Sequence, residues 1–212
     1  MIAPGPAIKP LVVLTADQNA RFALTGILSR VKSLGIASIQ VDYYVHPEKD
    51  PGVLRTAHDF LRIFARSHQH ALVIMDREGS GQEAKSREEM EEQIEKALGR
   101  SGWTDRGAAV VIDPELDLWV WSDSPHVDHE LGWSQHDPDL RSWLQGKGFL
   151  PEEAMKPPRP KEALEAALRF VRKPRSSAIY RALAEKVSLS RCSDPAFLKL
   201  TTVLKQWFTV ST

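Results

Sequence analysis

The first half of the chain alternates short continuous apolar runs with segments whose apolar residues recur at helical spacing. Leu11–Leu14 is an uninterrupted apolar run, as expected of a strand that is buried on both faces. The following segment places its apolar side chains on one helical face and ends at Gly35, a common helix stop. The predicted strands are residues 11–14, 39–45, 71–75 and 107–112, and the predicted helices between them are residues 18–34, 53–65 and 83–98.

This order of strands and helices predicts an α/β fold, with a mostly parallel, four-stranded sheet flanked by helices and connected by right-handed crossovers. After Pro114 the pattern becomes helical or irregular, beginning with a short predicted helix at residues 116–121. We expect an α/β core in residues 1–123, followed by a polar loop and Pro-rich linker in residues 124–160. Residues 161–212 are predicted to form a helical C-terminal cap that packs on the core.

Composition limits the classes of protein to consider. The 212 residues are 42% hydrophobic and 26% charged, which is typical of a globular chain rather than a disordered or fibrous one. The single cysteine, Cys192, excludes an internal disulfide framework and a Cys-rich zinc site. No apolar run approaches the roughly 20 residues that cross a bilayer, and the N-terminus lacks the apolar centre of a signal peptide. We therefore expect a soluble cytoplasmic protein with no membrane partner.

The formal net charge is zero, but the charges are unevenly distributed. Residues 151–212 contain 12 Lys and Arg against 6 Asp and Glu, so residues 1–150 contain 16 against 22. Four interpretations of the basic surplus stay open: solvated helix faces, docking on the acidic half, contacts with the phosphates of DNA, or binding to an acidic partner. The candidate nucleic-acid-binding side chains are Arg169, Arg172, Lys173 and Arg175.

Acidic residues follow three of the four predicted strands, at the edge of a parallel sheet where ligands usually bind. Asp76 and Glu78 come directly after the third strand and are two residues apart, so an extended backbone projects both carboxylates to the same side. Mg²⁺ would relieve their repulsion, because it binds one or two carboxylates together with water and phosphate. In the alternative interpretation Asp76 caps the turn and Glu78 faces solvent.

These motifs resemble the TOPRIM-like, DUF4276-type family of uncharacterised proteins found in phage-defence loci. The TOPRIM pattern has a Glu shortly after the first strand, an Asp-x-Asp after the third strand and a further acid beyond the fourth. The resemblance extends over nearly the whole chain and runs through residues 11–28, 71–79, 111–123 and 192–198.

The resemblance implies roles for individual residues. Asp76 and Glu78 match the Asp-x-Asp position, and Asp117 takes the place of the acid beyond the fourth strand. By this resemblance the three residues hold Mg²⁺, and the ion stabilises charge that develops on a phosphodiester during cleavage. Asp76 and Glu78 are accordingly also candidate catalytic residues. By the same resemblance the protein is expected to be a component of a prokaryotic antiviral defence system, with a methylation-associated system as one candidate, and to work with other proteins of the same locus.

The sequence departs from the TOPRIM pattern after its first strand. Thr15 stands where the family has its Glu, and Asn19 stands where an Asp follows four residues later. A Thr hydroxyl cannot exchange a proton near neutral pH as a carboxylate does. Asp17 is the candidate replacement for the catalytic acid, or alternatively the N-cap of the following helix. Two functions therefore stay open: a metal-dependent nuclease and a non-catalytic scaffold or interaction subunit of a defence complex.

A second group of metal-competent side chains lies in the predicted loop. His126 and His129 are spaced so that both imidazoles could approach one ion, although four ligands at a recognisable spacing are absent. An exposed polar loop is the alternative interpretation. The group consists of His126, Asp128, His129, Glu130, His136 and Asp137.

Overall fold

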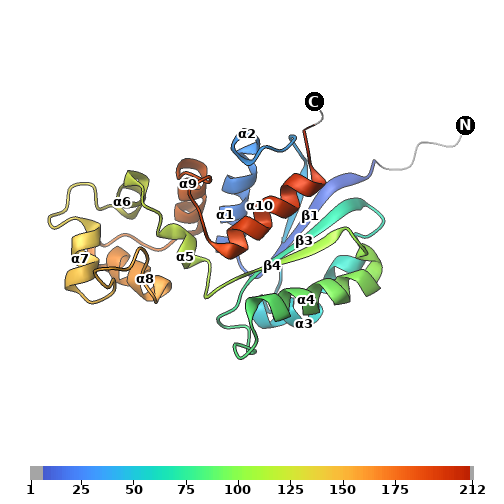
Figure 1. Cartoon of the computed structure of the whole chain (residues 1–212), viewed down its shortest axis with the longest axis horizontal. Helices are drawn as coiled ribbons and strands as arrows, with labels where there is room; N and C mark the ends of the chain where they lie inside the picture. Colours follow the sequence, from blue (N-terminus) through green and yellow to red (C-terminus); the bar gives the residue numbers. More distant parts are fainter. Residues whose placement is uncertain (1–6, 211–212) are drawn as a thin grey trace, which may run out of the picture.

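The computed structural model describes residues 7–210 and contains a four-stranded, all-parallel sheet (Figure 1). The strand order is β2-β1-β3-β4, which places β1 and β3 at the centre. The predicted α/β class and the four predicted strands are confirmed. The strands are β1 (Lys9–Thr15), β2 (Val41–Val45), β3 (His68–Asp76) and β4 (Gly107–Ile112).

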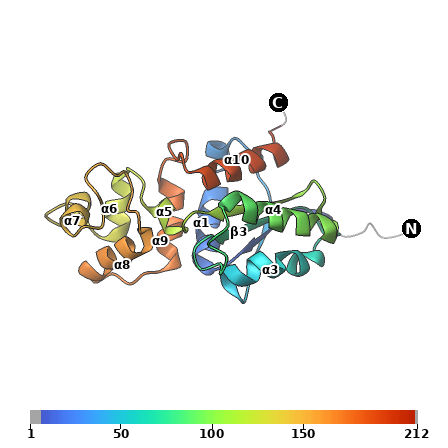
Figure 2. The same cartoon turned by 60° about the horizontal axis from the view of Figure 1, so that its bottom comes forward.

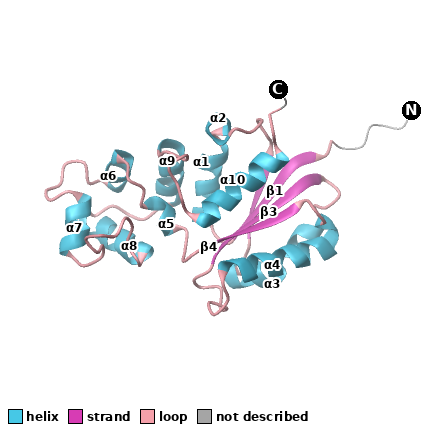
Figure 3. Ribbon diagram, viewed as in Figure 1, coloured by secondary structure: helices cyan, strands magenta, loops and turns pink. Residues whose placement is uncertain are grey.

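Helices cover both faces of the sheet (Figure 3). Leu11 and Val13 of β1 contribute to the core on the face covered by α1, whereas Val12 and Leu14 contribute to the core beneath α3 and α4. This alternation explains why the sequence shows β1 as a continuous apolar run, because both faces of a central strand are buried. The helices of the core are α1 (Gln18–Leu28), α2 (Val31–Leu34), α3 (Lys49–Arg62) and α4 (Arg87–Leu98).

The C-terminal half adds six helices, most of them beyond the carboxyl ends of the strands (Figures 1 and 2). The exception is α10, which returns to lie along the sheet beside β4. These helices are α5 (Asp117–Val120), α6 (Pro125–Leu131), α7 (Leu140–Gly146), α8 (Pro160–Phe170), α9 (Ser177–Lys186) and α10 (Pro195–Trp207).

The prediction that residues 124–160 form a loop and linker is wrong for two segments, because α6 and α7 lie within this range. Each helix begins at a polar cap: the Ser124 side chain accepts from the His126 backbone, and the Asp139 side chain accepts from that of Ser142. Each buries only a few apolar residues in its seven-residue length, too few for a helical period to be recognised in the sequence.

Strand β4 lies at the edge of the sheet, and its outer backbone groups are covered by side chains. The backbone N–H groups of Ala109 and Val111 donate to Oε1 of Glu95 and of Glu91, each at 3.0 Å. Lys199 on α10 contacts the same two carboxylates, Glu91 Oε2 at 3.1 Å and Glu95 Oε1 at 2.7 Å. Side chains of α4, held in place by Lys199 of α10, therefore bind backbone N–H groups of β4 that another strand would otherwise pair with.

No helix within residues 7–210 is long and apolar enough to span a membrane.

Helix α9 packs closely on α1 at Gly26. A Cβ atom at Gly26 would lie 2.7 Å from the backbone oxygen of Arg181 and 2.8 Å from the Cβ of Ala184. Neither obstacle is the flexible end of a side chain, so any larger residue must push the two helices apart. The absence of a side chain at Gly26 therefore sets the distance between α1 and α9.

We expect Gly26→Ala to lower the free energy of unfolding by about 1–3 kcal/mol, the usual cost of overpacking a close contact. The measurement is urea unfolding followed by circular dichroism. Gly146→Ala is the matched control, because nothing lies within 4 Å of a Cβ added at the end of α7. The control should leave stability unchanged or raise it by up to about 1 kcal/mol. Equal stability of the two variants would show that the α1–α9 contact adjusts freely.

Candidate functional site

Five carboxylates lie around the carboxyl edge of the sheet, and we call them the acidic cluster. Thr15 at the end of β1 pairs with Ile74 of β3, so the chain segments that follow these two strands begin side by side. Asp50 is not among the site residues predicted from the sequence, although it lies in the first turn of the helix after β2 and is recognisable as a strand-end acid. The members are Asp17, Asp50, Asp76, Glu115 and Asp117.

Asp76 is held between two neighbouring segments. Its backbone N–H donates to Oδ1 of Asp50 at 2.8 Å, and its own Oδ1 accepts from the backbone N–H of Leu116 at 2.9 Å. Burial raises the pKa of Asp76 well above its ordinary value, and the charges of Asp50, Asp17 and Asp117 raise it further. The hydrogen bond from Leu116 only partly opposes these effects. Asp76 is therefore the member with the least compensated negative charge.

Asp50 shares this environment. Burial is the main cause that raises its pKa, and the nearby charge of Asp17 adds to the effect. The hydrogen bond from the Asp76 backbone and the charge of Lys161 act in the opposite direction. Asp50 and Asp76 each use one carboxylate oxygen in the hydrogen bonds described above. Asp50 and Asp76 together provide carboxylate oxygens, the ligand atoms that hard cations prefer, in a region with an excess of negative charge.

The side chains after β1 serve the local structure. Asp17 is the N-cap of α1, because its Oδ1 accepts from the backbone N–H of Ala20 at 2.8 Å. Thr15 is fully buried, and its hydroxyl donates to the backbone oxygen of Asp17 at 2.9 Å. Asn19 Oδ1 accepts from the Ser177 hydroxyl at 2.8 Å. Asp17 also remains close enough for its charge to raise the pKa values of Asp50 and Asp76.

Asp117 differs from Asp76 in that an arginine neutralises it. Nη2 of Arg175 lies 3.0 Å from Oδ1 and 2.9 Å from Oδ2 of Asp117, and the Tyr180 hydroxyl donates to Oδ1 at 2.7 Å. Burial raises the pKa of Asp117, whereas Arg175 and Tyr180 lower it. Arg175 also contacts Glu165 at 3.1 Å. Asp117 therefore uses both oxygens within the protein.

Glu78 and Glu115 lie on the side of the cluster nearest Lys161. The Glu78 side chain is exposed, and its charge raises the pKa of Glu115. Glu115 is buried, which raises its pKa to about 7, and the charge of Asp117 acts in the same direction. Its Oε1 accepts from the backbone N–H of Lys161 at 3.2 Å, while Nζ of Lys161 is 4.0 Å from Oε2.

The four candidate nucleic-acid-binding side chains divide into two pairs. Arg169 and Arg172 are exposed and form no ion pair with any residue in the range 7–210. Lys173 donates to the backbone oxygen of Glu130 at 2.5 Å, and Arg175 is committed to Asp117. The tertiary structure thus leaves Arg169 and Arg172 available to solvent and uses the other two to fasten segments together.

The positions of these side chains bear on metal binding. Within the part of the chain that the structure describes, no group of three or more His, Cys, Asp and Glu side chains is placed to hold an ion. The predicted trio Asp76, Glu78 and Asp117 is therefore not gathered as a ligand set, and neither are His126 and His129 with their acidic neighbours. Mg²⁺ often binds through one or two carboxylates and keeps several waters. Asp76 and Asp50 fit that requirement.

The raised pKa of Glu115 predicts a specific pH dependence of stability. At pH 5 the folded protein keeps this carboxyl protonated, whereas the unfolded chain, with an ordinary pKa near 4.5, has mostly lost the proton. The contribution of Glu115 to the free energy of unfolding therefore falls as the pH rises from about 5 to 8, by on the order of 2–3 kcal/mol. Glu115→Gln should remove this part of the pH dependence and be more stable than the wild type at pH 8.

Denaturant unfolding at several pH values measures this difference. The matched control is Glu153→Gln, which removes an exposed carboxylate that forms no ion pair within residues 7–210 and should retain the wild-type profile. Parallel pH profiles for Glu115→Gln and the wild type would contradict the environment described for Glu115.

Comparison with known proteins identifies no relative of this chain. No family model matches the chain, and neither a curated protein nor a solved structure does.

Proposed function

We propose that this chain is a TOPRIM-like component of a prokaryotic antiviral defence system that binds Mg²⁺ at the acidic cluster and acts on nucleic acid. The observation that carries the metal-binding part is the environment of Asp76, where burial and then three neighbouring carboxylates raise the pKa, and the compensating contact is a single backbone N–H. A divalent cation relieves such repulsion more effectively than a proton at neutral pH. The assignment to antiviral defence rests on the sequence motifs around Asp76 and Asp117.

Asp76 and Asp50 are the proposed ligands, and they replace the trio suggested by the sequence. Asp17 adds negative charge to the site while it caps α1. When bound, Mg²⁺ supplies positive charge that attracts and polarises a phosphate oxygen. Lys161 lies beside this edge, where its charge lowers the pKa values of Asp50 and Glu115. Together with the exposed Arg169 and Arg172, it supports the choice of a phosphate-bearing partner.

Titration calorimetry with MgCl₂ or MnCl₂ tests the metal site. We expect millimolar or tighter binding to the wild type, and affinity at least about tenfold weaker in Asp76→Asn and in Asp50→Asn. Binding should also be tighter at pH 8 than at pH 6, because a carboxyl with a raised pKa must lose its proton to bind a cation. Glu153→Gln is the control and should bind as the wild type does. The absence of binding, or equal affinity in all four proteins, would reject the site.

A non-catalytic interaction subunit is the second candidate. Thr15 occupies the position of the family's catalytic Glu, and its buried hydroxyl is already bonded to the protein backbone. Asp17 is likewise used as a helix cap, so neither side chain is free to transfer a proton. This arrangement favours metal and nucleic-acid binding without cleavage.

Incubation of plasmid DNA with the protein and MnCl₂ distinguishes the two functions. Cleavage by the wild type that is lost in Asp76→Asn supports a nuclease. If calorimetry shows metal binding but the plasmid stays intact, the non-catalytic function is favoured. Cleavage that persists equally in Asp76→Asn would exclude the acidic cluster as its source.

A further inference from the structure

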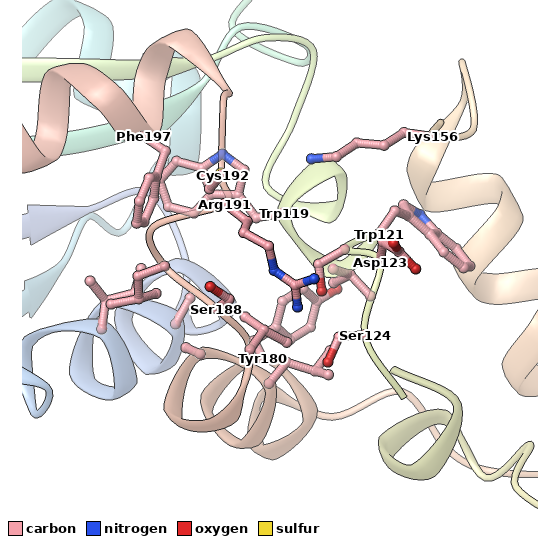
Figure 4. Close-up of a pocket in the computed structure, with 18 of the residues that line it drawn as sticks. Trp119, Trp121, Asp123, Ser124, Lys156, Tyr180, Ser188, Arg191, Cys192 and Phe197 are labelled. Carbon is pink, nitrogen blue, oxygen red and sulfur yellow. The ribbon is translucent and has the colours of Figure 1, made fainter. Parts of the chain in front are cut away.

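A second candidate site is a cavity of about 330 Å³ enclosed by α1, α5, α9 and the segment that leads into α10 (Figure 4). Its volume is at the lower end of the range for sites that bind small organic molecules. Most of the lining side chains are apolar, including Ile27, Leu116, Trp119, Tyr180, Leu183 and Phe197.

The aromatic walls of the cavity are fixed by contacts outside it. Nε1 of Trp119 donates to Oδ1 of Asp194 at 2.9 Å, and Nε1 of Trp121 donates to the backbone oxygen of Pro160 at 3.0 Å. The Tyr180 hydroxyl donates to Asp117. The ring of Trp119 also packs edge-on against Phe197, with centroids 5.5 Å apart. Because the polar atoms of these rings are already bonded, the rings offer the cavity rigid apolar surface.

Arg191 is an exposed residue that brings a positive charge to the mouth of this apolar cavity. Its side chain extends across the cavity, with Ser124 and Tyr180 near its guanidinium group (Figure 4). Within residues 7–210 the Arg191 guanidinium forms no hydrogen bond or ion pair, and Asp123, which also lines the cavity, does not pair with it. Lys156, also in the lining, donates to the backbone oxygen of Leu118 at 3.0 Å. Arg191 therefore keeps its donors available to a bound molecule.

The cavity thus combines rigid apolar walls with one exposed cation that has no hydrogen-bond or ion-pair partner among residues 7–210.

We propose that this cavity binds a small, largely apolar organic anion. The apolar part of the ligand contacts Trp119, Tyr180 and Phe197, while its anionic group accepts hydrogen bonds from the guanidinium of Arg191. An uncharged apolar molecule would make no use of the Arg191 guanidinium, and a polyanion would place excess charge against the aromatic walls. This site is separate from the acidic cluster, and the proposal does not depend on metal binding there.

The test uses anilinonaphthalene sulfonate, a fluorescent probe with an aromatic body and a single negative charge. The wild type should bind it with one saturable site, and Arg191→Gln should weaken the affinity about tenfold through loss of a charge-assisted hydrogen bond. Ser188→Trp, which places a large ring at the cavity wall, should also reduce binding. Arg169→Gln removes an exposed arginine outside the cavity lining and should bind as the wild type does.

Circular dichroism and thermal melting of each variant separate loss of the site from loss of the fold, because the probe also binds partly unfolded chains. Competition then tests the class of ligand: octanoate, an apolar carboxylate, should displace the probe, whereas AMP, which is polar and carries close to two negative charges, should not. Displacement by AMP and not by octanoate would overturn the proposal. A folded wild type that fails to bind the probe, or equal affinity in Arg191→Gln and Arg169→Gln, would overturn the proposal.

Discussion

The buried contact between Arg175 and Asp117 connects the C-terminal helices to the carboxyl edge of the sheet. Both oxygens of Asp117 accept from one guanidinium nitrogen, and Tyr180 of α9 donates to the same carboxylate. Removing one partner of a buried ion pair typically costs about 3–5 kcal/mol, because the remaining charge is left uncompensated. The orientation of Tyr180 and the chemical state of Asp117 both depend on this contact.

The same contact divides the acidic cluster into two parts with different properties. Asp117 is balanced by Arg175 and functions as an attachment point, whereas Asp76 and Asp50 face each other's charge and that of Asp17. Acidic residues that look equivalent in the sequence therefore serve different purposes in the fold. The uncompensated pair is the part with the chemistry to attract a cation, and the compensated residue forms the boundary between this edge and the neighbouring apolar cavity.

A second polar contact secures the far end of the C-terminal region. Lys199 on α10 binds Glu91 and Glu95, whose other contacts cover the backbone of the edge strand β4. With α9 packed on α1 and α10 beside β4, the C-terminal helices complete the core and protect the edge of its sheet. This arrangement also accounts for part of the basic surplus of residues 151–212, because Lys173, Arg175 and Lys199 are used in contacts within the protein.

The sequence by itself determined the parallel α/β architecture, because continuous apolar runs and helical spacing report local burial directly. It also placed Asp76 at a strand end, since β3 ends at that residue. The partners of these acids were decided only by the tertiary structure: Arg175 lies 58 residues from Asp117, and Asp50 lies 26 residues from Asp76. Hydrophobic periodicity carries no information about which distant side chains meet, because their contact depends on how the helices pack on the sheet.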